Sequence, residues 1–370
     1  MISDRLAPRG FGHNTLHLKQ RNNHQTQIDF VKIICPPYMG KQDSSQKEKK
    51  ADDLPTVLLL RQPFVLTVYE KQFSEKFRFL KPWESSMPLH QFLSTHAGSV
   101  KAAFFTAGRP ITADILQNLP ELRFIMTTSA GLDHIDLNEC KRRGIRVANA
   151  GSIFSEDVAD TAVGLLIDVL RRVSAANRFV KAGLWQKKGD YSLGHKLGGK
   201  RVGIVGMGSI GLSVAKKLNP FGCIISYTSR NKKPHLSFPF YPYIKELAAN
   251  CDIIIICCAL TDQTRHMIDK NVMLALGKEG VIVNVARGAI VNEKELVECL
   301  LKGEIAGAGL DVFENEPNVP EELFSLDNVV MTPHHAVMTD ESLNDLFQLV
   351  IGNLDAFFSN KPLTFEVVQA

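Results

Sequence analysis

The residue types best suited to chemistry stand at the ends of three predicted strands in the second half of the chain. Arg287 follows one apolar run, Glu316 closes an acidic turn that begins at Asp311, and His334 follows the last run. A guanidinium can bind a carboxylate through two parallel hydrogen bonds, and an imidazole can move a proton near neutral pH. A glutamate beside that imidazole can keep it oriented and charged. The set therefore predicts a site that binds a carboxylate and transfers a proton.

Each of these residues also has a purely structural interpretation. Arg287 could cap a helix or pair with a surface acid, Glu316 could be one acid of a polar loop, and Asp311 could serve a turn. His335 directly follows His334, so one of the two must be chosen as the proton carrier. Adjacent side chains on a strand point to opposite faces, which argues against a metal site formed by this pair. We therefore predict no metal.

A glycine-rich turn lies upstream of these strand ends. An apolar run over 202–205 leads into Gly206, Gly208 and Gly211, and helical spacing of apolar residues resumes directly afterwards. Gly206 can make the turn, Gly208 lets a pyrophosphate approach the backbone, and Gly211 lets the helix pack close to the strand. A phosphate would then meet free N–H groups at the positive end of the helix. The segment predicts a dinucleotide site, with an ordinary strand–turn–helix connection as the alternative.

The end of the next strand indicates which dinucleotide is bound. In NAD enzymes an acid at this point accepts hydrogen bonds from the ribose hydroxyls, and it would repel a 2′-phosphate. This chain instead has Thr228, Ser229 and Arg230, with Lys232 close behind. Hydroxyls and cations can bind a phosphate directly. We therefore predict NADPH as the preferred cofactor, and the alternative is a solvated basic loop.

These residues must be positioned by strands and helices that alternate along the chain. Apolar runs typical of buried strands lie at 57–60, 102–105, 124–126, 144–149, 202–205, 223–227, 252–258, 281–285, 306–312 and 329–332. Helical spacing is found at 112–116, 135–140, 271–276, 293–303 and 343–358. The alternation predicts an α/β fold with doubly wound parallel sheets, in which ligands bind beyond the carboxyl ends of the strands.

One long helix is predicted between the two halves of the chain. Ser155 is the expected N-cap, and Glu156 and Asp157 follow where negative charge is favoured. Helical spacing continues faintly to Trp185, and a loop over 182–200 then leads to the glycine-rich segment.

No strand is predicted after the amphipathic helix at 343–358, so this helix cannot start a new domain. We expect it to pack on the first domain. This predicts two Rossmann-like domains. The first is a discontinuous substrate-binding domain of residues 54–151 and 336–370. The second is a dinucleotide-binding domain of residues 152–335.

The composition is typical of a globular protein and narrows the range of partners. The chain has 370 residues, of which 45% are hydrophobic and 22% charged. The formal charge is +4, and +3 of it lies in residues 1–53, from nine Lys or Arg against six Asp or Glu. The remainder is near neutral, which argues against nucleic-acid binding. No apolar stretch approaches the roughly 20 residues of a membrane span, so no membrane partner is expected.

The location is predicted from the cysteines and from both ends of the chain. Seven cysteines without regular spacing favour reduced residues of an intracellular protein. Residues 1–53 lack a core pattern and are expected to form a disordered, dispensable extension. A transit peptide, or myristoylation after a start at Met39, is the alternative for this segment. The C-terminal Val-Val-Gln-Ala is not a peroxisomal address, which favours the cytoplasm.

Taken together, the motifs resemble those of the D-isomer-specific 2-hydroxyacid dehydrogenase family, over roughly residues 55–367. Within that family the chain is most similar to the plant-type NADPH-dependent glyoxylate/hydroxypyruvate reductases. Many motifs that match in the same order identify a family more specifically than any single motif does. Besides the glycine-rich turn, the matching segments are Ser129–Asp136, Asn149, Asp157–Asp160, Leu260–Thr264, Ala286–Gly288, Asp311–Phe313, Glu316–Pro317 and Pro333–His334.

The resemblance implies reduction of glyoxylate to glycolate, and of hydroxypyruvate to D-glycerate, by hydride transfer from the nicotinamide. Arg287 would bind the substrate carboxylate, helped by backbone N–H groups of Ala130 and Gly131. His334 would be the general acid in reduction, which favours it over His335, and Glu316 would be its partner.

The resemblance also implies the cofactor contacts and the oligomeric state. Asp311 would face the nicotinamide carboxamide. The other expected cofactor-binding residues are Gly206, Met207, Gly208, Ser209, Ile210, Gly211, Thr228, Ser229, Arg230, Lys232, Thr264 and Ala286. The partners would be a small 2-oxoacid and a second copy of the chain, giving a homodimer.

One departure from the family pattern leaves the substrate range open. After Pro333-His334 many relatives continue through a small Ser- or Gly-rich turn, whereas residues 335–339 here are bulkier. Phosphoglycerate and formate dehydrogenases remain as alternative activities. A non-enzymatic corepressor on the same fold is the alternative from a different class.

Overall fold

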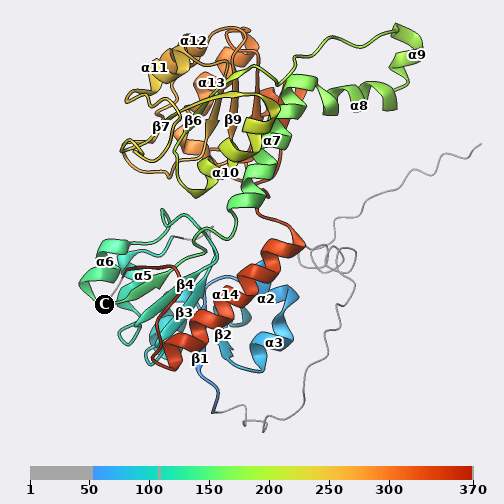
Figure 1. Ribbon diagram of the computed structural model, residues 1–370. Coiled ribbons are helices and arrows are strands. Elements are labelled where there is room, and N and C mark those ends of the chain that lie inside the picture. Colours follow the sequence, from blue (N-terminus) through green and yellow to red (C-terminus); the bar gives the residue numbers. More distant parts are fainter. Residues whose placement is uncertain (1–52, 107–109, 369–370) are drawn as a thin grey trace, which may run out of the picture. The chain divides into compact units, whose positions relative to one another are not determined.

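The computed structural model describes residues 53–106 and 110–368 (Figure 1). All of the described elements lie in one compact unit, residues 51–370. The predicted extension lies outside the described residues apart from Asp53, and so does Met39 with its alternative start.

Six strands form the first sheet, in the order β12-β5-β4-β3-β1-β2. β1 to β5 pair in parallel, and β12 pairs antiparallel with β5 at one edge. Every residue of β3 and β4 is buried, as expected for strands covered on both faces. The strands are Thr56–Leu59 (β1), Arg78–Leu80 (β2), Ala102–Phe105 (β3), Phe124–Thr127 (β4), Arg146–Ala148 (β5) and Glu366–Val368 (β12).

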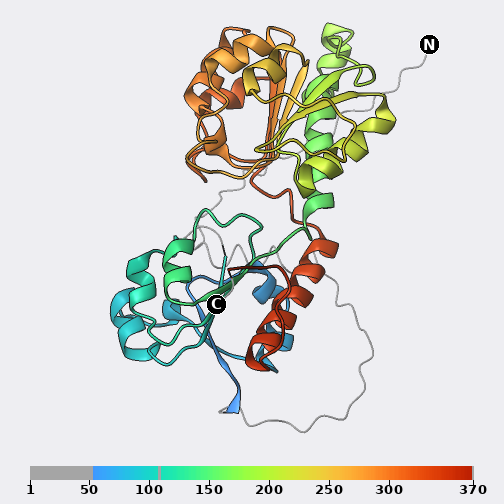
Figure 2. The ribbon, with the colours of Figure 1, turned by 60° about the vertical axis from the view of Figure 1, so that its left-hand side comes forward.

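The helices of the first domain include one from the far end of the chain. α14 (Asp340–Phe358) lies along the first sheet (Figure 2). Phe347 of α14 stacks on Tyr69 with ring centroids 4.3 Å apart, and Phe357 stacks on Phe124 at 5.0 Å. This domain is therefore discontinuous, as the sequence predicts. Its other helices are α2 (Phe64–Val68), α3 (Glu70–Ser74), α4 (Leu89–His96), α5 (Ala113–Gln117) and α6 (Leu137–Arg142).

The second sheet also has six strands, all parallel, in the order β11-β10-β9-β8-β6-β7. The strands are Arg201–Val205 (β6), Ile224–Thr228 (β7), Ile253–Ile256 (β8), Val281–Asn284 (β9), Gly307–Leu310 (β10) and Val329–Met331 (β11). The accompanying helices are α7 (Ser155–Arg171), α10 (Ser209–Leu218), α11 (Ile244–Ala249), α12 (Lys270–Leu276) and α13 (Glu293–Leu301). Short 3₁₀ turns lie at Pro82–Glu84, Asn219–Phe221, Gly288–Ile290 and Glu321–Ser325.

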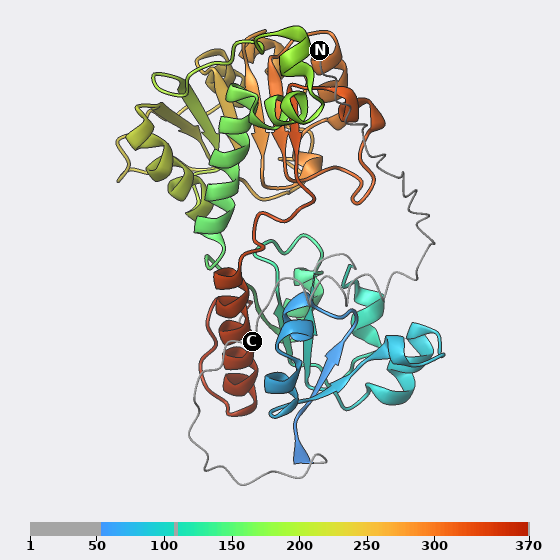
Figure 3. The same ribbon diagram turned by 90° about the vertical axis from the view of Figure 1, so that its right-hand side faces the viewer.

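α7 packs directly against the strands of the second sheet (Figure 3). The glycines of β10 make this close approach possible. A Cβ at Gly307 would lie 2.9 Å from Cγ1 of Val169, and one at Gly309 would lie 3.0 Å from Cβ of Leu165. A larger residue at either position would push α7 away from the sheet.

The two sheets repeat one strand order. The first runs β2-β1-β3-β4-β5 and the second runs β7-β6-β8-β9-β10, so each sheet reverses its direction of growth beside its first strand. In open α/β sheets, ligands bind beyond the carboxyl ends of the strands at such a reversal. In the second sheet this point lies between β6 and β8. The two parallel-sheet α/β domains predicted from the sequence are thus confirmed.

The start of α7 differs from the prediction. Ser155 is the first helical residue and not the N-cap, a position held by Phe154 without a side-chain cap. The N–H of Ser155 already donates to the carbonyl of Ser152 at 3.0 Å, so the turn before it carries the chain into helical conformation. Glu156 and Asp157 stand in the first turn as predicted.

The single long helix predicted to reach Trp185 is wrong. Arg172 adopts a left-handed conformation with φ 56°, which ends α7 and starts α8 (Val173–Lys181). The carboxylate of Asp168 accepts the N–H of Ser174 at 2.7 Å and stabilises this break. α9 (Leu184–Lys188) follows inside the segment predicted as a loop. Apolar spacing continues across the break, which is why the sequence pattern does not reveal it.

Candidate active site

Three predicted site residues follow three neighbouring strands. Arg287 comes after β9, Glu316 lies in the loop after β10, and His334 comes after β11. These strands are adjacent and parallel, so their carboxyl ends meet at one edge of the second sheet. The structure thus brings the guanidinium of Arg287, the carboxylate of Glu316 and the imidazole of His334 to the same edge of the sheet.

His334 and Glu316 form a hydrogen-bonded pair. Nδ1 of His334 lies 2.6 Å from Oε2 of Glu316, and Oε1 of Glu316 accepts the N–H of Phe313 at 3.0 Å. Burial alone would raise the pKa of this carboxyl, but hydrogen bonds from His334 and Phe313, with the charge of Arg287, hold that pKa below its ordinary value. Glu316 is therefore a carboxylate at neutral pH. Because Nδ1 faces Glu316, Nε2 is the ring nitrogen left to exchange a proton.

Asp311 holds the turn that carries His334. Its carboxylate is buried, and Oδ1 accepts the hydroxyl of Thr332 at 2.7 Å and the N–H of His335 at 2.9 Å. Oδ2 accepts the N–H of Ala336 at 3.2 Å. The backbone of His334 has φ 50°, a left-handed conformation that costs a non-glycine residue on the order of 1–3 kcal/mol and is common at active sites. Both oxygens of Asp311 are thus engaged by the turn, and its contact with a nicotinamide stays a prediction.

The guanidinium of Arg287 is fixed from two sides. Nε lies 3.3 Å from Oδ1 of Asp133, and Nη1 donates to the carbonyl of Ala286 at 2.8 Å. A Cβ on Gly131 would overlap Nη2 of Arg287, so this glycine leaves the room that the guanidinium occupies. The ion pair with Asp133 joins residues 154 positions apart, one from each domain.

The loop after β4 supplies the predicted backbone donors. The carbonyl of Ala130 accepts the side-chain amide of Asn149 at 2.6 Å, which orients this peptide. No partner is found among the described residues for the N–H groups of Ala130 and Gly131. His134 follows, with Nε2 3.2 Å from the hydroxyl of Thr127. Burial lowers the pKa of His134 below its ordinary value, and Arg287 adds to this while Asp133 opposes it.

The glycine-rich turn closely joins β6 and α10. Gly206 has φ 96°, and a Cβ there would lie 2.7 Å from Cα of Cys258. Gly208 has open space where a side chain would be, and no side chain caps α10. A Cβ on Gly211 would collide with the carbonyl oxygen of Gly206. These features fit a dinucleotide, because an uncapped helix N-terminus offers free N–H groups and positive charge to a phosphate. The remaining predicted residues of the turn are Met207, Ser209 and Ile210.

The segment after β7 carries hydroxyls and cations. β7 ends at the buried Thr228, and the hydroxyl of Ser229 donates to the carbonyl of Asn231 at 2.7 Å. The side chains of Arg230 and Lys232 are exposed. No acidic residue occurs between Thr228 and Glu246. The segment can therefore receive an additional phosphate group.

The remaining predicted cofactor residues have structural roles of their own. The hydroxyl of Thr264 donates to the carbonyl of Ala259 at 2.8 Å and accepts the N–H of Thr261 at 2.8 Å, so it holds the turn after β8. Ala286 is buried, and its N–H donates to Oδ1 of Asn284 at 3.1 Å.

Sequence reasoning missed two contacts near the site. Asp133 lies inside the motif 129–136 but received no role, and its partner Arg287 is 154 positions away, so no local pattern pairs the two. His266 and Glu314 form a second histidine–carboxylate pair, with Nε2 and Oε1 2.6 Å apart. These two residues are 48 positions apart, and nothing in the sequence pairs them.

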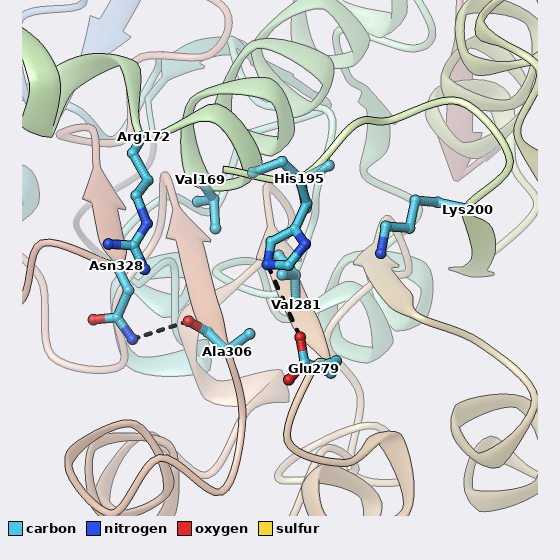
Figure 4. Close-up of a pocket in the computed structure, with 9 residues that line it drawn as sticks. Val169, Arg172, His195, Lys200, Glu279, Val281, Ala306 and Asn328 are labelled. Carbon is cyan, nitrogen blue, oxygen red and sulfur yellow. Dashed lines mark hydrogen bonds and ion pairs between the residues drawn. The ribbon is translucent and has the colours of Figure 1, made fainter. Parts of the chain in front are cut away.

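The hollow in Figure 4 lies at the opposite edge of the second sheet. Lys200, Glu279, Ala306 and Asn328 line it, and they stand just before β6, β9, β10 and β11. Its ion pair joins Nε2 of His195 to Oε2 of Glu279 at 3.9 Å. The hollow contains none of the predicted site residues and is not the candidate site.

Within ranges 53–106 and 110–368, no group of three or more His, Cys, Asp or Glu side chains is placed to hold a metal ion. Over the same ranges, no helix has the length and apolar character needed to cross a membrane.

Comparison with known protein families identifies one model. Residues 163–336 match the NAD-binding domain of the D-isomer specific 2-hydroxyacid dehydrogenases. This segment contains the glycine-rich turn, Arg287, Glu316 and His334.

Individual relatives are similar over more than four fifths of this chain. The glyoxylate/hydroxypyruvate reductase HPR3 of Arabidopsis thaliana is 53% identical over 310 residues, which are 84% of this chain and 96% of that protein. The hydroxyphenylpyruvate reductase of Plectranthus scutellarioides is 43% identical over 302 residues, covering 82% and 96%. Among solved structures, an NADPH-dependent glyoxylate/hydroxypyruvate reductase from Sinorhizobium meliloti, in complex with NADP and malonate, has a TM-score of 0.78. Its sequence identity is 34%, and the match covers 85% of this chain and 96% of that one.

Proposed function

Because this chain belongs to the D-isomer specific 2-hydroxyacid dehydrogenase family, we propose that it reduces glyoxylate to glycolate and hydroxypyruvate to D-glycerate with NADPH. Its relatives are oxidoreductases named for small 2-oxoacids. The observation that carries the proposal is the 2.6 Å contact between His334 and Glu316 at the sheet edge that also holds Arg287. Reduction of an oxoacid requires these three groups: a carboxylate clamp, a proton donor and a partner for that donor.

Arg287 binds the carboxylate of the oxoacid. Asp133 occupies Nε, and the carbonyl of Ala286 takes one N–H of Nη1. The other N–H groups on Nη1 and Nη2 remain for two parallel hydrogen bonds to a carboxylate. The N–H groups of Ala130 and Gly131 add two further donors from the first domain.

His334 delivers the proton. When bound, NADPH supplies the hydride that adds to C2 of the oxoacid. As the carbonyl oxygen gains negative charge, Nε2 of His334 donates its proton to that oxygen, which becomes the hydroxyl of the product. Glu316 is ionised and stabilises the imidazolium before the transfer, and it keeps Nδ1 engaged so that Nε2 faces the reaction. In oxidation the same nitrogen accepts the proton.

The preference for NADPH rests on the segment after β7. Ser229, Arg230 and Lys232 would hold the 2′-phosphate, which no acid in this segment repels. The uncapped N-terminus of α10 and the open position at Gly208 would receive the pyrophosphate. Thr264, Ala286 and Asp311 belong to the loops that would line the nicotinamide end. The NADP in the Sinorhizobium relative supports this choice.

We assign substrate binding to residues 54–151 and 336–370, and cofactor binding to residues 152–335. The packing of α14 and β12 with the first sheet supports this division. We further propose a homodimer. Apolar side chains of the α8–α9 region are exposed, with Trp185 at 62% and Leu193 at 92%, and such patches commonly mark an interface. A monomeric mass in analytical ultracentrifugation would contradict this.

We place the protein in the cytoplasm. The cysteines among the described residues are all free, which suits a reducing compartment. Fluorescence of a tagged full-length chain that colocalises with an organelle marker would overturn this assignment.

The proposed function is tested by steady-state turnover. NADPH and NADH are each supplied with glyoxylate, hydroxypyruvate, 4-hydroxyphenylpyruvate and 3-phosphohydroxypyruvate. We expect the highest kcat/KM with NADPH and one of the first two oxoacids. His334→Gln should lower kcat by roughly 10²- to 10⁴-fold and leave the Kd for NADPH unchanged, because the imidazole acts on the substrate oxygen.

Other outcomes identify other activities. Preference for the aromatic oxoacid would assign the substrate of the Plectranthus relative to this chain. Preference for the phosphorylated oxoacid would favour a phosphoglycerate dehydrogenase. If NADPH binds but no oxoacid is reduced, a non-enzymatic role such as corepression becomes the better reading.

A further inference from the structure

The loops after β8, β9 and β10 are joined to one another beyond the ends of the strands. Nε2 of His266, in the loop after β8, lies 2.6 Å from Oε1 of Glu314, in the loop after β10. The N–H of His266 donates to the carbonyl of Ala289, in the loop after β9, at 2.8 Å. His266 has φ 52°, so its backbone is held in an unfavourable conformation by these contacts. Neither side chain takes part in the mechanism proposed above.

The turn around Glu314 is also held by contacts with α13 and with the loop after β9. Its N–H donates to Oε1 of Glu293, the first residue of α13, at 2.9 Å. A Cβ on Gly288 would overlap the Phe313–Glu314 peptide, so this turn lies directly on the residue after Arg287. Gly288 therefore forms part of the surface on which this turn rests.

The same turn carries the carboxylate that faces the imidazole. Glu316 is two residues beyond Glu314, and its Oε1 accepts the N–H of Phe313. A displacement of the turn at Phe313 and Glu314 shifts the backbone of Phe313, whose N–H makes this hydrogen bond, and with it the carboxylate on Nδ1 of His334. The His266–Glu314 contact is the side-chain link that ties this turn to the loop after β8.

We propose that His266 and Glu314 are positioning residues, which hold the turn at 313–316 so that Glu316 stays against His334 and beside Arg287. The proposal rests on the function assigned above, because it concerns the proton-transfer pair of that reaction. It places the second histidine–carboxylate pair outside the chemistry and gives it a mechanical role.

This role predicts that removal of either partner has the same effect. Glu314→Ala and His266→Ala should each lower kcat by roughly 10- to 100-fold, because small misplacements of catalytic groups cost this much. KM for the oxoacid and Kd for NADPH should stay within about twofold of wild type, since Arg287 and the glycine-rich turn are retained. Glu314→Gln keeps a hydrogen-bonding group for His266 and should restore most of the activity.

The design separates positioning from an effect of charge. Glu314→Ala removes a carboxylate and His266→Ala removes an imidazole, so a direct electrostatic effect on the site would differ between the two variants, whereas loss of positioning would be the same in both. The double variant should be no slower than either single variant. In a Glu316→Gln background neither substitution should cause a further loss, because the carboxylate that they position is already gone.

Glu298→Ala is the matched control. It removes the exposed ion pair in which Oε2 of Glu298 lies 3.4 Å from Nζ of Lys302 on α13, and it should leave kcat unchanged. Thermal unfolding of every variant shows whether it is folded. If Glu314→Ala does not fold, His266→Ala and Glu314→Gln carry the test.

Failure of the proposed function and failure of the positioning role would give different results. Absence of oxoacid turnover in the wild type would overturn the proposed function. Wild-type turnover with unchanged kcat in folded His266→Ala and Glu314→Ala would overturn the positioning role, and so would additive losses, or losses of full size in the Glu316→Gln background.

Discussion

At the scale of single residues, hydrogen bonds fix one side of His334 and of Arg287 and leave the other side available to a substrate. One carboxylate oxygen of Glu316 accepts the N–H of Phe313, and the other contacts Nδ1 of His334. His334 therefore presents Nε2, and Arg287, held at Nε by Asp133, presents its Nη groups. Preorganisation of this kind saves the cost of reorienting groups during the reaction. The substitutions expected to be most damaging are those that release one of these fixed contacts.

The residue that should decide cofactor choice is Arg230. Arg230→Ala should reduce the ratio of kcat/KM with NADPH to kcat/KM with NADH by roughly 10- to 100-fold, the equivalent of one charge-assisted hydrogen bond to a phosphate. The activity with NADH itself should change little. Steady-state kinetics with both cofactors measures the ratio. Lys245→Ala, which removes an exposed cation from α11, is the control. A ratio unchanged in Arg230→Ala would show that the phosphate is not bound there.

His134 should make stability depend on pH. Burial lowers its pKa in the folded protein below the ordinary value of 6.5. Between these two values the unfolded chain binds more protons than the folded one, so the free energy of unfolding falls as the pH drops below about 6.5. Urea denaturation at pH 7.5 and 5.5 should show a larger loss for wild type than for His134→Gln. Equal losses in the two proteins would mean that His134 is not the group responsible.

At the scale of elements, α14 should contribute strongly to the stability of the first domain. Phe347 is buried, stacks on Tyr69, and meets Phe73 edge to face with centroids 5.1 Å apart. Phe347→Ala should therefore lower the free energy of unfolding by about 3–5 kcal/mol. Phe324→Ala removes a phenylalanine that is 64% exposed and should change it by about 0.5 kcal/mol or less. Chemical denaturation of both variants tests whether α14 is docked, and similar values for the two would refute it.

Elements with a fully apolar run or a long one-sided stripe were predictable, and elements with a mixed or partly exposed pattern mostly were not. The run at 102–105 predicts β3 residue for residue, and the stripe at 343–358 predicts most of α14, because both are long or fully apolar signals. Segments that are short or only partly buried show too few repeats to reveal a period. The elements missed in this way are α2, α3, β2, α4, α11 and β12.

Some residues of the candidate site could be predicted from the sequence, and others could not. Arg287, Glu316 and His334 could be predicted because each directly follows a clear strand, and the edge at which parallel strands end is a property of the fold. The contacts of Asp133 with Arg287, and of His266 with Glu314, depend on how loops from distant parts of the chain meet. No local pattern encodes such contacts, so they required the structure.

At the scale of the whole molecule, the described part of the chain contains both sheets and every candidate site residue. β1 begins at Thr56 and pairs with β2 and β3, so it lies in the interior of the first sheet. The compact unit that contains β1 comprises residues 51–370. The boundary between a dispensable segment and an essential one should therefore fall within a few residues of position 53.

Two deletions test this boundary. Removal of residues 1–52 should leave kcat, KM and the thermal midpoint as in the full chain, because all of the described strands and every candidate site residue lie after position 52. Removal of residues 1–60 differs by only eight positions but takes away β1, whose Val57, Leu58 and Leu59 are fully buried between β2 and β3. Loss of three such side chains costs about 2–5 kcal/mol each, which together is comparable to the whole net stability of a typical domain, and the strand's hydrogen bonds to β2 and β3 are lost as well, so this protein should not fold. Circular dichroism and turnover of both proteins decide the matter. Loss of activity in the shorter deletion would show that the N-terminal segment is required by the catalytic unit.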